Sequence, residues 1–166
     1  MRRLKHFLIR HEPTARQLSH FKSAAGATVA MTLVAALSLW AGLPLLLGPL
    51  AGTVALIFSY PDSALAQPVN ILGGYVLAAT MTALLIALWP GHWWLATILV
   101  GVVVATMLML RVTHPPAGAV PVLAMGHPVA PMTLFETILF GAFCLVLIAL
   151  IHHRLPPRTQ YPRRVE

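Results

Sequence analysis

A proline-containing turn in the second half of the chain holds the residues best suited to chemistry. Its members are Thr113, His114, Pro115, Pro116, Ala117, Gly118 and Ala119. Two adjacent prolines cannot continue an incoming helix, because each lacks an N–H group and clashes with the preceding turn. Both are tolerated at the start of a new helix, where the missing donor costs nothing. The pattern predicts that the backbone breaks here and restarts as a short helix with free N–H groups around Gly118 and Ala119.

The start of a helix carries unpaired N–H groups and about half a positive charge, which together favour a bound anion. Gly118 has no side chain, so a solute or a second backbone could approach it closely. Thr113 and His114 stand just before the helix and could cap it or contact a solute. These features predict a small monovalent anion as the ligand. The structural alternative is a tight bend in which the glycine only packs helices together.

A second proline break lies 66 residues earlier. Shifting the chain by that distance aligns Pro49–Val54 with Pro115–Val120, and proline, alanine, glycine and valine coincide. Gly52 and Thr53 then belong to an equivalent half-helix that starts at Pro49. The pattern predicts an internal duplication with repeats 23–88 and 89–152, each made of a span, a proline-started half-helix and a span. Transporters often bind their solute where such half-helices from two repeats meet.

The composition is that of a membrane protein. The chain has 166 residues, of which 58% are hydrophobic and only 9% charged, and its mean hydropathy is +0.82. A soluble domain would carry roughly a quarter charged residues. Between Lys22 and Arg154, the only formal charges are on Asp62, Arg111 and Glu136. This distribution excludes a soluble globular domain and predicts a chain that crosses the bilayer several times.

The positions of the elements follow from segment lengths. A spanning helix needs about 20 apolar residues, and segments 23–42, 70–89, 93–112 and 132–151 satisfy this requirement. We therefore predict an all-α polytopic fold with four spanning helices plus two short proline-initiated re-entrant helices. A six-crossing arrangement, in which segments 43–60 and 115–132 also cross, stays open. Arg111 favours that alternative mildly, because it would then lie on the cytoplasmic side.

Basic residues are concentrated in the two flanks of the apolar domain, residues 1–22 and 153–166. Short flanks rich in Lys and Arg stay in the cytoplasm. We expect a basic arm (1–22), a transmembrane domain (23–152) and a basic tail (153–166), with both termini cytoplasmic and the protein in a bacterial inner membrane. The flanks are interpreted as topology signals that contact the lipid bilayer, and no nucleic acid is expected as a partner.

Other function classes find less support in the residues. Eight histidines and seven methionines suggest metal transport, but no His-x3-His, cysteine pair or carboxylate cluster has ligand spacing. No metal or other cofactor is therefore expected. The chain shows no nucleophile–base pair, so it is not expected to be an enzyme. A non-transporting membrane scaffold or subunit stays open as the second hypothesis. A chain of this size has little interior of its own, which favours a homo-oligomer.

Two motifs resemble a known family. Thr113–Ala119 is similar to the signature of the HPP family of integral membrane proteins, named for its His-Pro-Pro. The spaced residues of a second motif resemble that family's Ser-Pro-Leu-Ala-Gln-Pro loop: Phe58, Pro61, Ser63, Leu65, Ala66, Gln67, Pro68, Asn70, Gly73 and Gly74. The likeness covers roughly residues 20–152. It implies a four-span membrane domain, and the family includes members implicated in nitrite transport.

These observations together predict a transporter or channel for a small monovalent anion, with nitrite as the best guess. The residues expected to line or shape the substrate pathway are Thr113, His114, Pro115, Pro116, Gly118, Ala119, Pro49, Gly52, Thr53, Gln67, Asn70 and Arg111. Gln67 and Asn70 are expected at the mouth of the pathway. Arg111 either faces the pathway or extends to the membrane interface.

Overall fold

The computed structural model describes residues 17–41, 47–126 and 129–164. These residues form six α-helices and two short 3-10 helices, with no strand among them. The elements are α2 (Gln17–Ala41), α3 (Leu47–Ser59), η1 (Ala64–Ala66), α4 (Pro68–Leu88), α5 (Trp93–Met109), η2 (Pro115–Ala119), α6 (Val120–Gly126) and α7 (Pro131–His152). The all-α prediction is confirmed. Residues 1–16 of the predicted basic arm and the start of the second apolar run lie outside the described residues.

Prolines determine where several helices begin. Pro68, Pro115 and Pro131 each stand at the first position of a helix, where their fixed φ suits the helix and no N–H is missed. The residues before them have extended backbone, as expected for residues that precede proline. The predicted break at the His-Pro-Pro turn is therefore confirmed. Pro49 differs slightly, because α3 begins two residues earlier, at Leu47.

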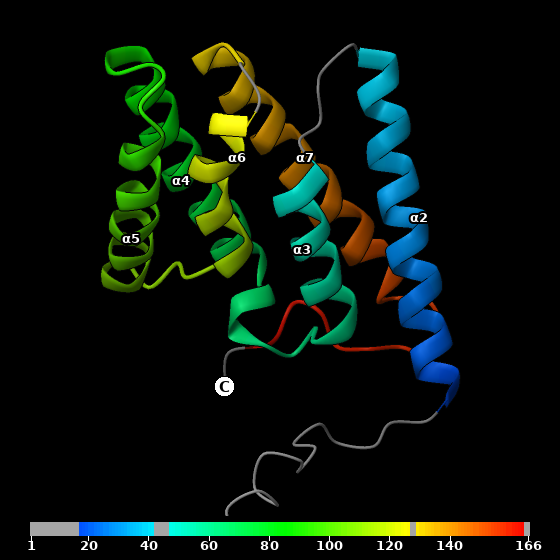
Figure 1. Cartoon of the computed structure of the whole chain (residues 1–166). Helices are drawn as coiled ribbons and strands as arrows, with labels where there is room; N and C mark the ends of the chain where they lie inside the picture. The colour runs from blue at the N-terminus through cyan, green and yellow to red at the C-terminus, as the bar shows by residue number, and fades with distance from the viewer. Residues whose placement is uncertain (1–16, 42–46, 127–128, 165–166) are drawn as a thin grey trace, which may run out of the picture.

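Successive helices run in alternating directions along the bundle (Figure 1). α2 runs from the lower to the upper end of that view, and α4 also runs upward, so α3 between them runs down. In the second half, α5 runs down, η2 and α6 run up, and α7 runs down. A re-entrant α3 would return to the end from which it came. The observed order of directions instead matches the six-crossing alternative of the sequence analysis.

The apolar helices that follow α2 fall into two groups by length. α4 and α7, with 21 and 22 residues, are long and apolar enough to cross a membrane. The apolar helices over 48–59, 93–109 and 115–125 are shorter. At 1.5 Å per residue, α3 reaches about 20 Å, less than the ~30 Å of a hydrocarbon core. The prediction of four spanning helices with two re-entrant ones is thus not confirmed by helix length or by helix direction.

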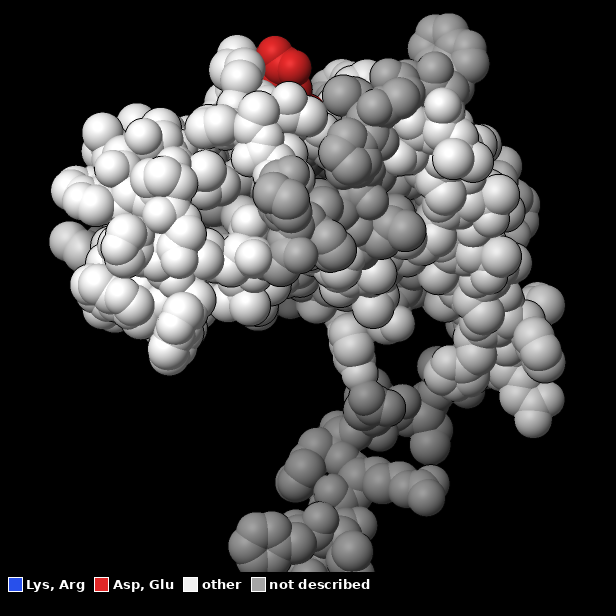
Figure 2. All heavy atoms as spheres, turned by 45° about the horizontal axis from the view of Figure 1, so that its top comes forward, with Lys and Arg blue, Asp and Glu red and all other residues white. Residues whose placement is uncertain are grey.

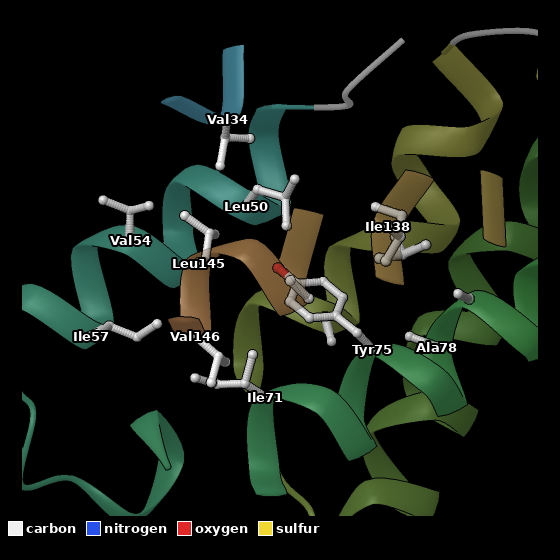
Figure 3. Packing of buried hydrophobic residues seen from close by; sticks show 14 of the residues in the cluster. Val34, Leu50, Val54, Ile57, Ile71, Tyr75, Ala78, Ile138, Leu145 and Val146 are labelled. Atoms are coloured by element: carbon white, nitrogen blue, oxygen red, sulfur yellow. The ribbon is translucent and has the colours of Figure 1, made fainter. Parts of the chain in front are cut away.

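The core lies where α3, α4 and α7 meet, and α4 and α7 pack extensively on each other. Leu50, Val54 and Ile57 of α3 lie close to Leu145 and Val146 of α7 (Figure 3). Tyr75 extends from α4 into this cluster with its ring fully buried, and its hydroxyl oxygen points away from α4. A phenol at the centre of an apolar core needs a hydrogen-bond partner. The short helix α3 provides it, as described below.

The described basic residues lie at one end of the bundle. Lys22 is near the start of α2, Arg111 follows the end of α5, and the arginines at 154, 158, 163 and 164 follow the end of α7. These three helix ends share the lower end in Figure 1. Figure 2 brings the upper end forward, and no Lys or Arg is visible on the described surface in that view. The two ends of the bundle therefore differ strongly in charge.

Candidate functional site at the contact between α3 and η2

His114 lies at the centre of the predicted site and is fully buried. It is the residue just before η2, with extended backbone, and its ring is held at both nitrogens. Nδ1 lies 2.9 Å from the carbonyl oxygen of Leu65, and Nε2 lies 2.8 Å from the hydroxyl of Thr53 in α3. The imidazole thus connects the second proline break to both α3 and the η1 loop.

The hydrogen bonds assign the proton on the neutral His114 ring. The Leu65 carbonyl can only accept, so Nδ1 carries the proton and Nε2 accepts from the Thr53 hydroxyl. The Tyr75 hydroxyl, 2.6 Å from the Thr53 oxygen, then donates to that oxygen. The Thr53 hydroxyl oxygen also lies 3.2 Å from the carbonyl oxygen of Pro49, one turn earlier in α3. The result is a continuous chain from Tyr75 through Thr53 and His114 to Leu65, which we call the central cluster.

The central cluster carries no carboxylate. Its partners are hydroxyls, one imidazole and backbone carbonyls. Among the described residues, the acidic side chains are Asp62 and Glu136, and both are exposed. Because a charged group in an apolar interior is costly without a partner, a neutral His114 fits this environment. A site without fixed negative charge does not repel an anion.

Small residues allow the two proline breaks to approach each other. A Cβ added at Gly52 would lie 3.3 Å from Pro116 Cβ, so α3 and η2 are in direct contact at this point. A Cβ added at Gly74 of α4 would lie 2.8 Å from His114 Cβ and 3.2 Å from the carbonyl oxygen of Val112. Only glycine therefore fits between α4 and the His-Pro-Pro turn. The predicted meeting of the two breaks is present in the structure.

Other predicted site residues hold the surrounding backbone. The Asn70 side-chain amide donates to the carbonyl oxygen of Thr113 at 3.1 Å, which ties the start of α4 to the turn. The Gln67 amide nitrogen donates to the carbonyl oxygens of Pro61 and Ser63 at 2.9 and 2.8 Å. Arg111 is exposed, with φ of 57°, and lies apart from the central cluster. The structure therefore brings Asn70 and Thr113 to the site, whereas Gln67 braces the loop beside it.

The remaining predicted residues differ in burial. Pro49 and Gly118 are buried, and Pro116 is half-buried against Gly52. Pro115 and Ala119 are exposed on the outer side of η2. These last two residues shape the backbone of the turn, and neither takes part in the hydrogen bonds of the central cluster.

The C-terminal tail covers the η1 loop next to the site. The buried Tyr161 hydroxyl donates to the carbonyl oxygen of Ala66 at 2.9 Å. The backbone N–H of Arg163 donates to the Gln67 side-chain oxygen at 2.8 Å. Figure 1 shows the tail running beside this loop at the lower end of the bundle. Gln67 was expected at the mouth of a pathway, and in this conformation the tail occupies its side-chain oxygen.

Two cavities lie at opposite ends of the bundle, and His114 lines neither. The larger, of about 990 Å³, lies between the start of α2, the end of α3, the end of α7 and the tail. The smaller, of about 440 Å³, lies between the ends of α4 and α6 and the start of α7. The central cluster is sealed from both in this conformation, so the two proline breaks meet in packed protein.

Sequence reasoning missed Tyr75 and Leu65 as members of the site. Tyr75 carries a polar atom inside an apolar spanning segment, and this was the signal that could have identified it. Leu65 contributes only its carbonyl oxygen, which no side-chain pattern reveals. The tail residue Tyr161 was missed for a similar reason, because its partner is a backbone carbonyl on a distant loop.

An apolar helical bundle with a buried polar cluster between two proline-broken helices is typical of membrane proteins that handle solutes. A family model described as "HPP, transmembrane region" matches residues 12–162, which is most of the chain. The protein therefore belongs to the HPP family and is a membrane protein. No curated protein and no solved structure matches it.

Proposed function

We propose that this protein transports a small monovalent anion across the membrane, with nitrite as the first candidate. The observation that supports this proposal best is the central cluster itself. A buried, hydrogen-bonded imidazole, two hydroxyls and a proline break lie together in an otherwise apolar bundle. Polar groups in a membrane interior are costly and are mostly retained where they serve a pathway.

The chemistry of the cluster suits an anion better than a cation. It offers two hydroxyls and an imidazole, with no carboxylate. Cation sites in membrane proteins use carboxylates or rings of carbonyls. The bundle end with the basic residues would raise the local concentration of an anion. Nitrite is chosen because the sequence resembles a family with members implicated in nitrite transport.

Passage requires the central cluster to open. His114 has both ring nitrogens occupied and no exposed surface, so the described conformation is closed. Opening would separate α3 from η2, exchange the bond between Thr53 and His114 for bonds to the solute, and leave α4 and α7 in contact. The contact between Gly52 and Pro116 is where the two short helices would part.

The proposed topology places the basic end of the bundle in the cytoplasm. Lys and Arg near spanning segments remain on the cytoplasmic side, and the described ones gather at one end. The start of α2 and the end of α7 are at that end, so both flanks would be cytoplasmic, after six passages. The membrane would be the bacterial inner membrane, and no cofactor and no enzymatic reaction are part of the proposal.

The scaffold hypothesis has one observation in its favour: the central cluster is closed and its hydrogen bonds are satisfied. Flux measurements on purified protein in liposomes separate the two functions. A panel of nitrite, nitrate, formate and chloride should show saturable flux for at least one anion, with nitrite fastest. A scaffold would give the background leak of empty liposomes for every anion.

A further inference from the structure

The helix packing has a two-fold pattern that relates the two halves of the chain. α2 packs on α3 and α7, and α5 packs on α6 and α4. α3 packs on α7, as α6 packs on α4. In this pattern α2 occupies the position equivalent to that of α5, α3 the position equivalent to that of η2–α6, and α4 the position equivalent to that of α7. It agrees with the 66-residue shift that aligns Pro49 with Pro115. Because each half has three helices and directions alternate, the two halves have opposite orientations in the bundle (Figure 1).

The two cavities follow the same relation. Five residues that line the smaller cavity lie 66 positions from residues that line the larger one. The pairs are Ala24 and Pro90, Phe58 and Ala124, Ser59 and Met125, Ser63 and Val129, and Ile86 and His152. The cavities are therefore equivalent positions of the two halves, one at each end of the bundle.

The central cluster lies between them. The larger cavity is lined by Phe58 and Ser59, at the end of α3, which is about 8 Å beyond Thr53 at 1.5 Å per residue. The smaller is lined by Ala124 and Met125, at the end of α6 far from His114. Because α3 and α6 run in opposite directions, the two cavities lie on opposite sides of the contact between Thr53 and His114.

The cavities differ in charge. The larger is lined by the basic or protonatable side chains His20, Lys22, His152, His153 and Arg158, against one acidic side chain, Asp62. His153 is almost fully buried there, its Nε2 donates to the carbonyl oxygen of Ile57 at 3.2 Å, and its Nδ1 is therefore an acceptor. The positive charge of this cavity comes from Lys22 and Arg158. The described residues that line the smaller cavity are apolar, apart from the backbone. Among the described lining residues, only those of the larger cavity carry side chains that can attract an anion.

From this arrangement we propose that the protein is an inverted repeat whose two equivalent cavities are the opposite mouths of one pathway. The central cluster is the barrier between them, and the basic mouth is a binding site for a small monovalent anion. The inference rests on the proposed transport function and adds the entry site and the symmetry that allows the barrier to open toward either end. In the described conformation neither cavity reaches the closed cluster, because no residue of the cluster lines either one.

Thiol labelling from each side of the membrane tests the two mouths. The single native cysteine is first replaced by Cys144→Ser, and the repeat-equivalent variants Ser59→Cys and Met125→Cys are then made separately. A charged, membrane-impermeant maleimide is applied to membrane vesicles of either orientation. We expect Ser59→Cys to react from the side of the C-terminal tail and Met125→Cys from the other side. Gly101→Cys, on an exposed face of α5, should react from neither side.

Nitrite protection tests the basic mouth. At nitrite about nine times its dissociation constant, labelling of Ser59→Cys should slow about tenfold, because only the unoccupied fraction reacts. Labelling of Met125→Cys should not change. When Arg158→Gln is combined with Ser59→Cys, nitrite should no longer slow the labelling of the cysteine at position 59. Protection by inorganic phosphate or anionic lipid without protection by nitrite would contradict a site for a small monovalent anion.

The outcomes separate this inference from the transport proposal. Labelling of both cysteines from the same side, or of neither, would overturn the two-mouth arrangement even if wild-type protein transports nitrite. If the two cysteines react from opposite sides but the wild-type protein shows no anion flux in liposomes, the transport function is refuted while the inverted repeat is retained. A second pair, Ser63→Cys and Val129→Cys, repeats the test if a variant of the first pair elutes from size exclusion as an aggregate.

Discussion

Removing the Thr53 hydroxyl should destabilise the folded bundle by about 1–3 kcal/mol. Thr53→Val keeps the shape of the side chain but deprives Tyr75 and His114 of their common partner. Interhelical hydrogen bonds in membrane proteins contribute about 0.6 kcal/mol on average and up to about 1.7. Two such bonds are lost, and Tyr75 and His114 are too deeply buried to find water instead. The free energy of unfolding can be measured by SDS titration of the protein in mixed micelles.

The chain offers a matched control for this substitution. Thr82 of α4 is also buried, but its hydroxyl has no hydrogen-bond partner in the described structure. Thr82→Val should therefore leave stability within about 0.5 kcal/mol of wild type or raise it, because an unpaired buried hydroxyl is costly. In a double-mutant cycle, Thr53→Val and Tyr75→Phe should couple by about 1 kcal/mol. Equal losses for the two threonines, or no coupling, would refute the central cluster as described.

Three further predictions concern packing, pH and the tail. Gly74→Ala should lower the free energy of unfolding by about 1–3 kcal/mol in the same assay, because the added Cβ would collide with His114. Its control is Gly101→Ala, whose Cβ would meet nothing within 4 Å. That variant should be neutral or slightly stabilising. Burial lowers the pKa of His153, just beyond α7, from 6.5 to about 4. Only the unfolded state therefore takes up a proton there as the pH falls from 6.5 to 4, so stability should fall across that window and His153→Gln should flatten the profile. Tyr161→Phe removes a buried hydrogen bond from the tail to η1 and should speed limited proteolysis of the tail severalfold.

Much of the fold could be predicted from the residues, because membrane insertion and proline chemistry act locally. The apolar segment predicted over 70–89 is observed as Pro68–Leu88, and the one over 132–151 as Pro131–His152. Helix restart at Pro115 followed from the missing N–H alone. Each of these predictions depends on a short stretch of chain, so it did not require knowledge of the tertiary packing.

The number of crossings could not be predicted in the same way. The short helix predicted from Pro115 to about Met125 would be about 16 Å long, too short to span by itself, which favoured re-entrant helices. The structure shows that α3 continues toward the far end of the bundle (Figure 1), because α4 starts there. The direction of a short helix depends on where its neighbours begin, which is a property of the assembled bundle.

The sequence predicted the residues at the centre of the candidate site but not the partners that surround them. Thr53 and His114 were selected from different breaks, and the structure places them 2.8 Å apart. Their partners include the Leu65 carbonyl and the phenol of Tyr75. Gln67 was placed at a pathway mouth, yet it bonds to the tail. Backbone partners and tail contacts arise from tertiary packing, so the spacing of side-chain types gives no signal for them.

Nitrite flux through liposomes that contain the His114→Ala variant tests the central claim most directly. The control is His92→Ala, which removes an exposed imidazole at the turn before α5, away from the central cluster. We predict that His114→Ala inserts and elutes like wild type but lowers nitrite flux by at least about tenfold, whereas His92→Ala transports like wild type. A tenfold change corresponds to about 1.4 kcal/mol in the barrier to passage. Unchanged flux in a correctly inserted His114→Ala protein would contradict a pathway through the contact between α3 and η2.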